Sequence, residues 1–266
     1  MDEPYKASPD IHVLPTHLPL PGVGNIPVNA FLLLAEEPVL IDAGLGIDGA
    51  EFVAALESLI PLRDLRWIWL THDDADHTGS LRTLMERAPQ ARLVTHGLGA
   101  LRMATQWPVP LDRVHALALE DRLSVGDRIL RAVRPPVFDN PTSTGIYDES
   151  TGVFFSVDSF GAILPEVTQD VADVPEDALT EGMVAWATFD VPWVHLVDEA
   201  RFERVLDAVR ALQPGRVLSS HLPAASGSVE GFLKVLSSLR DAEPFVAPKK
   251  EAFEELVRQL PPPGIH

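Results

Sequence analysis

The sequence contains no cysteine among its 266 residues. Disulfide bridges, thiolate metal ligands, iron–sulfur clusters and cysteine nucleophiles are therefore excluded. The sequence also lacks an apolar run of about 18 residues, so we expect no membrane span and no membrane partner. The N-terminal stretch MDEPYKASPD lacks the basic and apolar pattern of a secretory signal. Together these absences predict a cytoplasmic location.

Basic residues are scarce as well. Lys and Arg together number 21, against 39 Asp and Glu, which gives a formal net charge of −18. Such a surface repels phosphate backbones, so nucleic acid is not an expected partner. Hydrophobic residues make up 46% of the chain, which is enough for a sizeable core. We expect one domain over residues 1–266, with a core at about 11–240 and a helical C-terminal tail at 241–266.

Short apolar runs bounded by turn residues predict several strands. They are Ala30–Leu34, Val39–Ile41, Arg66–Leu70 and Ala91–Thr95. Residues 114–156 alternate apolar runs with turns and predict a β meander.

Three-four hydrophobic spacing predicts the helices. One helix follows Gly46 and ends before Pro61. After Gly161 the sequence is acidic and loop-like, and a helix is then expected around residues 202–209. Two more are expected at about 227–239 and 250–260.

Three separate apolar strands end in a residue type that binds metals. The run WIWLTH ends in His72, VFFSVD in Asp158 and VLSSH in His221. Rigid scaffolds place functional groups at strand ends, although polar residues also cap many strands that have no such role.

The stretch THDDADHTG concentrates acids and imidazoles directly after one of these strands. His72, Asp74 and Asp76 lie two positions apart in the loop, and His77 lies at the start of a helix. Carboxylate and imidazole are ligands for zinc, iron and manganese. The alternative interpretation is a solvated turn in which an aspartate caps the helix.

This motif resembles the metal motif H-x-H-x-D-H of the metallo-β-lactamase superfamily. The segments LIDAGLG, SVDSFG and SSHLP resemble three further segments of that superfamily, in the same order, and the resemblance covers about residues 14–223. It implies the metallo-β-lactamase fold, an α/β architecture in which two mixed β-sheets form an αββα sandwich with helices on the outer faces. The site is then expected in a groove along one edge of the sandwich.

Within the superfamily the sequence resembles most the oxygen-binding di-iron domain of flavodiiron proteins. That domain has an acid where Asp74 stands here, and its bridging segment commonly reads D-x-F-G, as Asp158–Gly161 does. The stretch GMVAWATFDVPWV also resembles its aromatic segment. The resemblance implies one metal held by His72, Asp74 and a further ligand, and Asp158 as the bridge to a second metal. The second metal would be held by Asp76, His77 and His221.

One position departs from the family pattern. The further ligand in the family is a histidine in a segment resembling H-x-P-D-S, and the matching stretch VFDNPTST places Asp139 there. Asp139 either replaces that histidine as a ligand or leaves the first site damaged, which would give a metal-free or one-metal scaffold. It could also be only an Asx-turn residue ahead of Pro141.

The predicted ligand set is rich in carboxylates. Such a set favours harder ions than the imidazole-rich zinc sites of hydrolases do, so we expect two iron ions, with zinc and manganese as alternatives. The resemblance then implies a protein that binds or reduces O2 or NO. Because no flavin domain follows His221 in this sequence, reduction would need a separate electron-donor protein.

The alternative function is that of a metal-dependent hydrolase. A metal-bound water would attack the carbonyl of a small ester, thioester or lactone, and Asp76 is the catalytic candidate that would orient this water or act as its base. Asp42 is expected to be a hydrogen-bonding partner beside the site rather than a ligand. Trp186, Trp193 and Phe160 either wall the pocket or pack in the core. The amphipathic segment KKEAFEELVRQL packs on the domain or at the contact of a homodimer.

Overall fold

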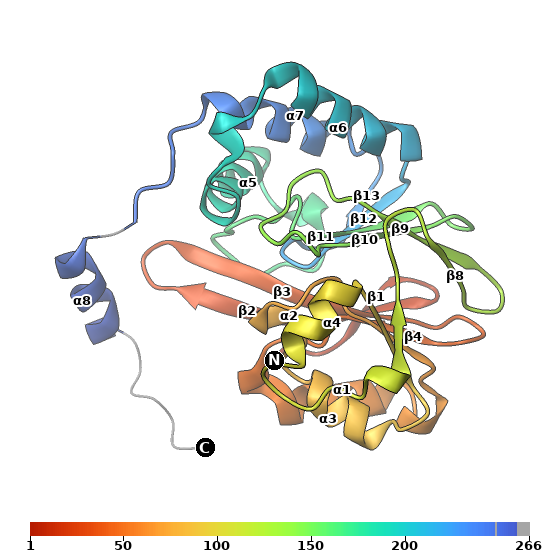
Figure 1. Cartoon of the computed structure of the whole chain (residues 1–266). Coiled ribbons are helices and arrows are strands. Elements are labelled where there is room, and N and C mark those ends of the chain that lie inside the picture. Colours follow the sequence, from red (N-terminus) through yellow and green to blue (C-terminus); the bar gives the residue numbers. More distant parts are fainter. Residues whose placement is uncertain (248, 260–266) are drawn as a thin grey trace.

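A computed structural model describes residues 1–247 and 249–259 of the chain. Two mixed β-sheets pack face to face, and helices cover their outer faces (Figure 1). This arrangement confirms the predicted αββα sandwich.

The first sheet has seven strands in the order β1-β2-β3-β4-β5-β6-β7. Its strands are β1 (Tyr5–Ser8), β2 (Ile11–Leu20), β3 (Gly24–Leu33), β4 (Val39–Ile41), β5 (Trp67–Trp69), β6 (Arg92–Thr95) and β7 (Val114–Ala116). Strands β1 to β4 are antiparallel neighbours, whereas β4 to β7 run parallel. Parallel neighbours point the same ends to one edge of the sheet, which is where the loop after β5 emerges.

The second sheet has six strands in the order β13-β12-β11-β10-β9-β8. Its strands are β8 (Arg122–Ser124), β9 (Ile129–Val133), β10 (Gly145–Asp148), β11 (Val153–Val157), β12 (Arg216–Ser219) and β13 (Ala225–Ser226). The antiparallel meander therefore runs only from β8 to β11, because β7 pairs with β6 of the first sheet. The prediction of a meander from residue 114 was wrong for β7, because the sequence of a short apolar strand does not indicate which sheet the strand joins. Strands β11 and β12 run parallel, so both end at the same edge.

Helices flank both sheets. They are α1 (Gly49–Leu59), α2 (Ala75–Thr78), α3 (Leu81–Arg87), α4 (Gly97–Met103), α5 (Glu176–Asp190), α6 (Glu199–Leu212), α7 (Glu230–Ser238) and α8 (Lys250–Gln259). Short 3-10 turns lie at Gly46–Asp48, Leu62–Asp64, Leu111–Arg113, Val171–Asp173, Val194–Leu196 and Leu239–Asp241. The buried faces of α1 and α3 pack on the first sheet, and those of α5, α6 and α7 pack on the second.

The hydrophobic residues form three layers of core that follow from strand periodicity. Along β3, Phe31 and Leu33 point between the sheets, whereas Ala30 and Leu32 point toward α1 and α3. Side chains alternate in this way because successive residues of a strand face opposite sides of the sheet. Every residue from Ile26 to Leu33 is buried, so β3 is covered on both faces and anchors the sandwich.

Two helices differ from what the sequence predicts. Helix α5 occupies part of the segment that was expected to be an acidic loop, and that expectation was wrong. Met183, Trp186 and Ala187 have helical spacing, but the acidic first half of the helix and the small number of buried residues hide this stripe. Helix α8 lies beside the sandwich rather than on it (Figure 1), and the predicted end of this helix at Leu260 lies outside the described residues.

Among the helices of the described ranges, none combines the length and the apolar character needed to cross a bilayer.

Candidate metal centre

The residues singled out as metal ligands come from both sheets and meet at one edge of the sandwich. His72 follows β5, Asp158 follows β11 and His221 follows β12. The loop after β5 also carries Asp74, and helix α2 carries Asp76 and His77. The remaining member, Asp139, lies between β9 and β10. We call this set the seven-residue cluster: His72, Asp74, Asp76, His77, Asp139, Asp158 and His221.

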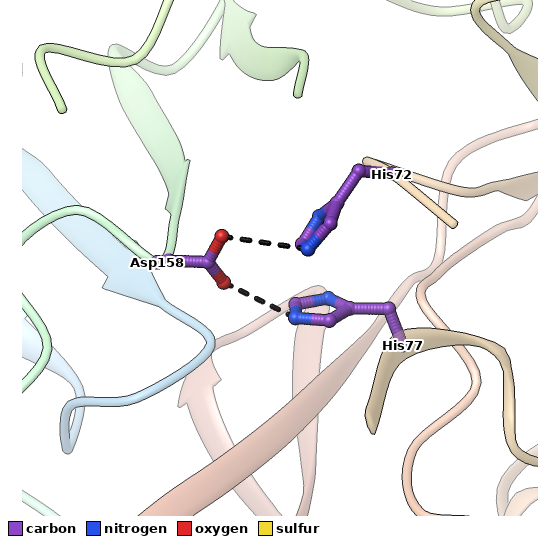
Figure 2. Close-up of side chains that lie close together, drawn as sticks. All are labelled: His72, His77 and Asp158. Carbon is purple, nitrogen blue, oxygen red and sulfur yellow. Dashed lines mark ion pairs between the residues drawn. The ribbon is translucent and has the colours of Figure 1, made fainter. Parts of the chain in front are cut away.

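The two oxygens of Asp158 face different histidines. Oδ2 lies 3.5 Å from Nε2 of His72, whereas Oδ1 lies 3.1 Å from Nε2 of His77 (Figure 2). The Nε2 of His221 also lies 3.1 Å from Oδ1. One carboxylate thus presents one oxygen to each of two groups of side chains, which is the geometry of a bridging ligand.

The ligand atoms of the cluster fall into overlapping groups, each with its atoms within 4.8 Å of one another. They are His72, Asp74 and Asp139; Asp76, His77 and His221; and His72, His77 and Asp158. The first two groups share no residue, and the third joins them through Asp158. Each of the first two groups could hold one cation, and Asp139 lies in the first of them despite its departure from the family pattern.

Hydrogen bonds to the other ring nitrogen orient each histidine. His77 Nδ1 lies 2.8 Å from Oδ2 of Asp42, and His221 Nδ1 lies 2.8 Å from the carbonyl oxygen of Pro27. Both partners only accept, so Nδ1 carries the hydrogen and the lone pair of Nε2 points into the cluster. Asp42 therefore acts as the expected hydrogen-bonding partner beside the site.

His72 is oriented in the same way through a hydroxyl. Thr71 Oγ1 donates to Asp42 Oδ1 at 3.0 Å and lies 3.2 Å from His72 Nδ1, so it accepts from that ring. The imidazoles thus present Nε2 lone pairs toward the carboxylate of Asp158.

A cation fits this arrangement. Asp158 is buried, with 3% of its surface exposed, and when the facing Nε2 atoms carry no hydrogen neither of its oxygens receives a hydrogen bond from any described residue. Buried carboxylate oxygens without donors are costly unless a positive charge compensates them. Lone pairs of imidazoles and carboxylates that converge on one buried space supply the donor set that metal ions take.

The electrostatics of the cluster also call for positive charge. Burial opposes ionisation of Asp158, yet the neighbouring His72 and His77 hold the pKa of its carboxyl well below its usual range. Burial likewise opposes protonation of His77, but Asp42 and Asp158 raise the pKa of that ring well above its usual value. Metal ions would therefore compete with protons for these side chains.

Asp139 is the weakest acid of the cluster. Burial, followed by the charges of Asp158 and Asp74, raises the pKa of Asp139 to about 7. The raised pKa reflects repulsion between Asp139 and the neighbouring carboxylates. A bound cation would reduce this repulsion.

Asn140 lies beside the cluster, and the sequence did not point to it. Its Nδ2 donates to Asp74 Oδ1 at 2.9 Å and to Asp73 Oδ1 at 3.2 Å. Arg102 donates to Asn140 Oδ1 at 3.2 Å and pairs with Asp73 at 3.1 Å. This network fixes the carboxylate of Asp74 from outside the cluster. Only its position directly after Asp139 in VFDNPTST could have drawn attention to Asn140.

Asp190 is a second residue that the sequence analysis missed. It ends α5, and its Oδ2 is buried without a hydrogen-bond partner among the described residues. Burial, followed by the charge of Asp158, raises the pKa of Asp190 to about 8. Asp190 belongs to the stretch GMVAWATFDVPWV. Its position in the sequence, far from the predicted ligands, did not indicate that α5 would bring it near the cluster.

Among the aromatic candidates, Trp186 lies at the cluster. Its ring lies 4.3 Å from that of His221, and its Nε1 donates to the carbonyl oxygen of Asp158 at 3.0 Å. Phe160 instead packs in the core against Phe232, and Trp193 packs on the same core from its edge.

Known proteins resemble this chain in sequence and in fold. It is 31% identical over 137 residues to a type A flavoprotein of Rhodobacter capsulatus, covering 50% of this chain and 32% of that protein. It is also 31% identical over 134 residues to an anaerobic nitric oxide reductase flavorubredoxin of Salmonella typhi, covering 50% of this chain and 28% of that protein. The flavodiiron protein from Giardia intestinalis has the same fold, with a TM-score of 0.78 at 15% identity over 90% of this chain and 59% of that one.

The chain spans about a third of the length of these two curated relatives. The family model described as ODP family beta lactamase matches residues 26–221. This range starts within β3, ends at His221 and includes the whole seven-residue cluster. Because the match extends over more than half of the 266 residues, the chain belongs to the ODP family of beta lactamase proteins.

Proposed function

We propose that this chain holds two iron ions in the seven-residue cluster and binds or reduces O2 or NO there. The observation that carries the proposal is the division of Asp158 between the two groups, with Oδ2 toward His72 and Oδ1 toward His77 and His221. A carboxylate with this placement supports a dinuclear centre over a single metal. The named activity of the nitric oxide reductase relative supports the choice of gas.

The composition of the cluster supports iron. Four of its members, Asp74, Asp76, Asp139 and Asp158, are carboxylates, and the other three are histidines. Oxygen-rich sets suit iron and manganese better than zinc. In our proposal the first ion takes His72, Asp74 and Asp139, the second takes Asp76, His77 and His221, and Asp158 bridges them.

The side chains around the ions would have distinct roles. Two reduced iron ions would supply the electrons and the coordination positions that O2 or NO require. Asp42 and Pro27 hold His77 and His221 in the tautomer whose Nε2 faces inward. The carboxyl of Asp190 can hold a proton near neutral pH beside the cluster, and reduction of these gases consumes protons. An electron donor would return the iron ions to the reduced state after each turnover.

The test combines metal analysis with gas consumption. Protein produced without added metal is expected to contain about two iron ions per chain. The chemically reduced protein should then remove O2 or NO from solution, as followed with a gas electrode. A His77→Ala variant of the same length is the matched control, since it should lose both metal and consumption.

A different result would contradict the proposal. Stoichiometric zinc, together with cleavage of esters, thioesters or lactones that chelation abolishes, would indicate the hydrolase alternative and a role for Asp76 at the attacking water. An iron-loaded protein that neither binds nor consumes either gas would also contradict it.

A further inference from the structure

A large apolar pocket opens on one side of the seven-residue cluster. Its volume is about 680 Å³, and Asp76 and His221 lie in its wall. Neither Asp74 nor Asp139 lines the pocket. It therefore reaches the cluster only at the group of Asp76, His77 and His221, which we call the second metal group. The hairpin of β2 and β3 forms one wall, and the end of α5 forms the opposite one.

The size of this pocket exceeds what the proposed function requires. One water molecule accounts for about 30 Å³ of liquid, and a diatomic gas is of similar size. Ligand pockets of roughly 300–1,000 Å³ take organic molecules of drug size. A volume of about 680 Å³ therefore indicates a larger ligand than O2 or NO.

The lining specifies the chemistry of that ligand. The hairpin contributes aliphatic side chains such as Leu18 and Val23, whereas α5 and the segment after α7 contribute Trp186, Phe189 and Phe245. The rings of Phe189 and Phe245 meet edge to face at 5.3 Å. Among the described residues that line the pocket, none is Lys or Arg, so it offers no side-chain cation to a phosphate, sulfonate or carboxylate.

The rim of the pocket exposes apolar surface that a ligand would cover. Leu18 is 45% exposed, Val23 68%, Phe189 48% and Phe245 44%. Apolar surface gains about 25 cal/mol for each Å² removed from water, so filling the space between these side chains is favourable. The ionisable side chains in the lining are Asp76 and His221, and both belong to the cluster.

We propose that this pocket binds a neutral, largely hydrocarbon aromatic molecule with one oxygen-bearing end directed at Asp76 and His221. The aromatic wall of Trp186, Phe189 and Phe245 packs on the rings, the hairpin covers the opposite face, and the oxygen reaches the second metal group. The inference rests on the proposed function only for this oxygen contact. Binding of the rings depends on the pocket alone.

The test uses two fluorescent probes that share one ring skeleton. N-phenyl-1-naphthylamine is neutral, and 1-anilinonaphthalene-8-sulfonate carries the same rings with a sulfonate. Each is titrated into the full chain, both metal-loaded and metal-free. In the metal-free protein the neutral probe is expected to bind saturably, at one site per chain, about tenfold more tightly than the sulfonate, because the lining has no Lys or Arg to pair with the sulfonate.

Variants place the binding in this pocket. Ala185 lies on the exposed side of α5 and lines the pocket, so Ala185→Trp should fill it and weaken the neutral probe about tenfold or more. Ala54→Trp makes the same change at an exposed position of α1, away from the pocket, and should leave binding unchanged. Phe245→Ala changes an exposed rim residue and gives a second measurement if Ala185→Trp fails to fold. It should weaken the neutral probe severalfold.

The oxygen-bearing end is tested by competition. 2-Naphthol should displace the neutral probe better than 2-methylnaphthalene does, and its advantage should grow in the metal-loaded protein. Equal binding of the two probes, no saturable binding with metal content intact, or binding unaffected by both Ala185→Trp and Phe245→Ala would overturn the pocket proposal. Loss of gas consumption with probe binding intact would overturn only the proposed function.

Discussion

The carboxylate of Asp42 lies 2.8 Å from Nδ1 of His77 and also accepts the backbone N–H of Thr71 at 2.9 Å. This contact joins the end of β4 to the helix that carries two members of the seven-residue cluster. It determines which ring nitrogen of His77 is left to face Asp158, because a carboxylate accepts a hydrogen and cannot donate one.

Replacement of Asp42 by Asn should weaken metal binding without unfolding the chain. Asp42 has φ of 60°, a left-handed conformation that Asn also tolerates, so the backbone should be kept. An amide can turn its NH2 toward Nδ1, which would reverse the tautomer of His77. Changes of this kind cost about 10–100-fold in metal affinity. Competition with a chelator measures it, and Asp48→Asn, which makes the same change at an acceptor of Thr16 outside the cluster, is the control.

We expect Asp139 to decide whether the first group holds a metal. Asp139→Ala should lower the metal content from about two ions per chain to about one, because the first ion would keep only His72, Asp74 and a share of the bridging Asp158. Asp139→His should keep both ions, since imidazole can replace the carboxylate. Metal analysis of purified protein gives the answer. Two tightly held ions in Asp139→Ala would show that this residue is only a turn residue ahead of Pro141.

Asp190 should make the metal-free protein less stable as the pH rises. Its pKa is raised from 3.8 to about 8 on folding, so the folded state disfavours the carboxylate. The cost is absent below pH 3.8, grows as the pH rises toward 8 and is complete above that value. Asp190→Asn should therefore stabilise the metal-free chain by at least about 1 kcal/mol near pH 8 and hardly at all near pH 4.

Urea unfolding of metal-free protein at several pH values measures this difference. Glu181→Gln, an exposed acid on the same helix, is the matched control and should show no such trend. A difference between Asp190→Asn and the native chain that does not change with pH would contradict the prediction.

Close packing around Gly161 explains why the D-x-F-G segment has a glycine at this position. A Cβ at this position would lie 2.4 Å from Nε1 of Trp186 and 2.8 Å from Cβ of His221. Gly161→Ala should therefore displace the ring of Trp186 and the side chain of His221, destabilise the fold by about 1–3 kcal/mol and lower metal affinity. Gly231→Ala lies on α7, where nothing approaches within 4 Å, and should be neutral or slightly stabilising. Thermal unfolding and chelator competition give both quantities.

The sequence alone was sufficient for the parts of the site that depend on local spacing. His72, Asp74, Asp76 and His77 lie within six positions after a buried strand, so any turn there gathers them. Strand and helix periods likewise predicted β4, β6 and α1 closely, because the hydrophobic pattern within each element determines its apolar face.

Only the tertiary structure decided how the distant residues meet. The pairing of β11 with β12 and the packing of the two sheets place Asp158 between His72 and His221, so that its two oxygens separate. Asp190 and Asn140 come close to the cluster through α5 and the loop before β10, and the apolar pocket exists only between the hairpin and α5. Such contacts depend on how sheets and helices pack across long sequence separations, and no local hydrophobic pattern encodes that packing.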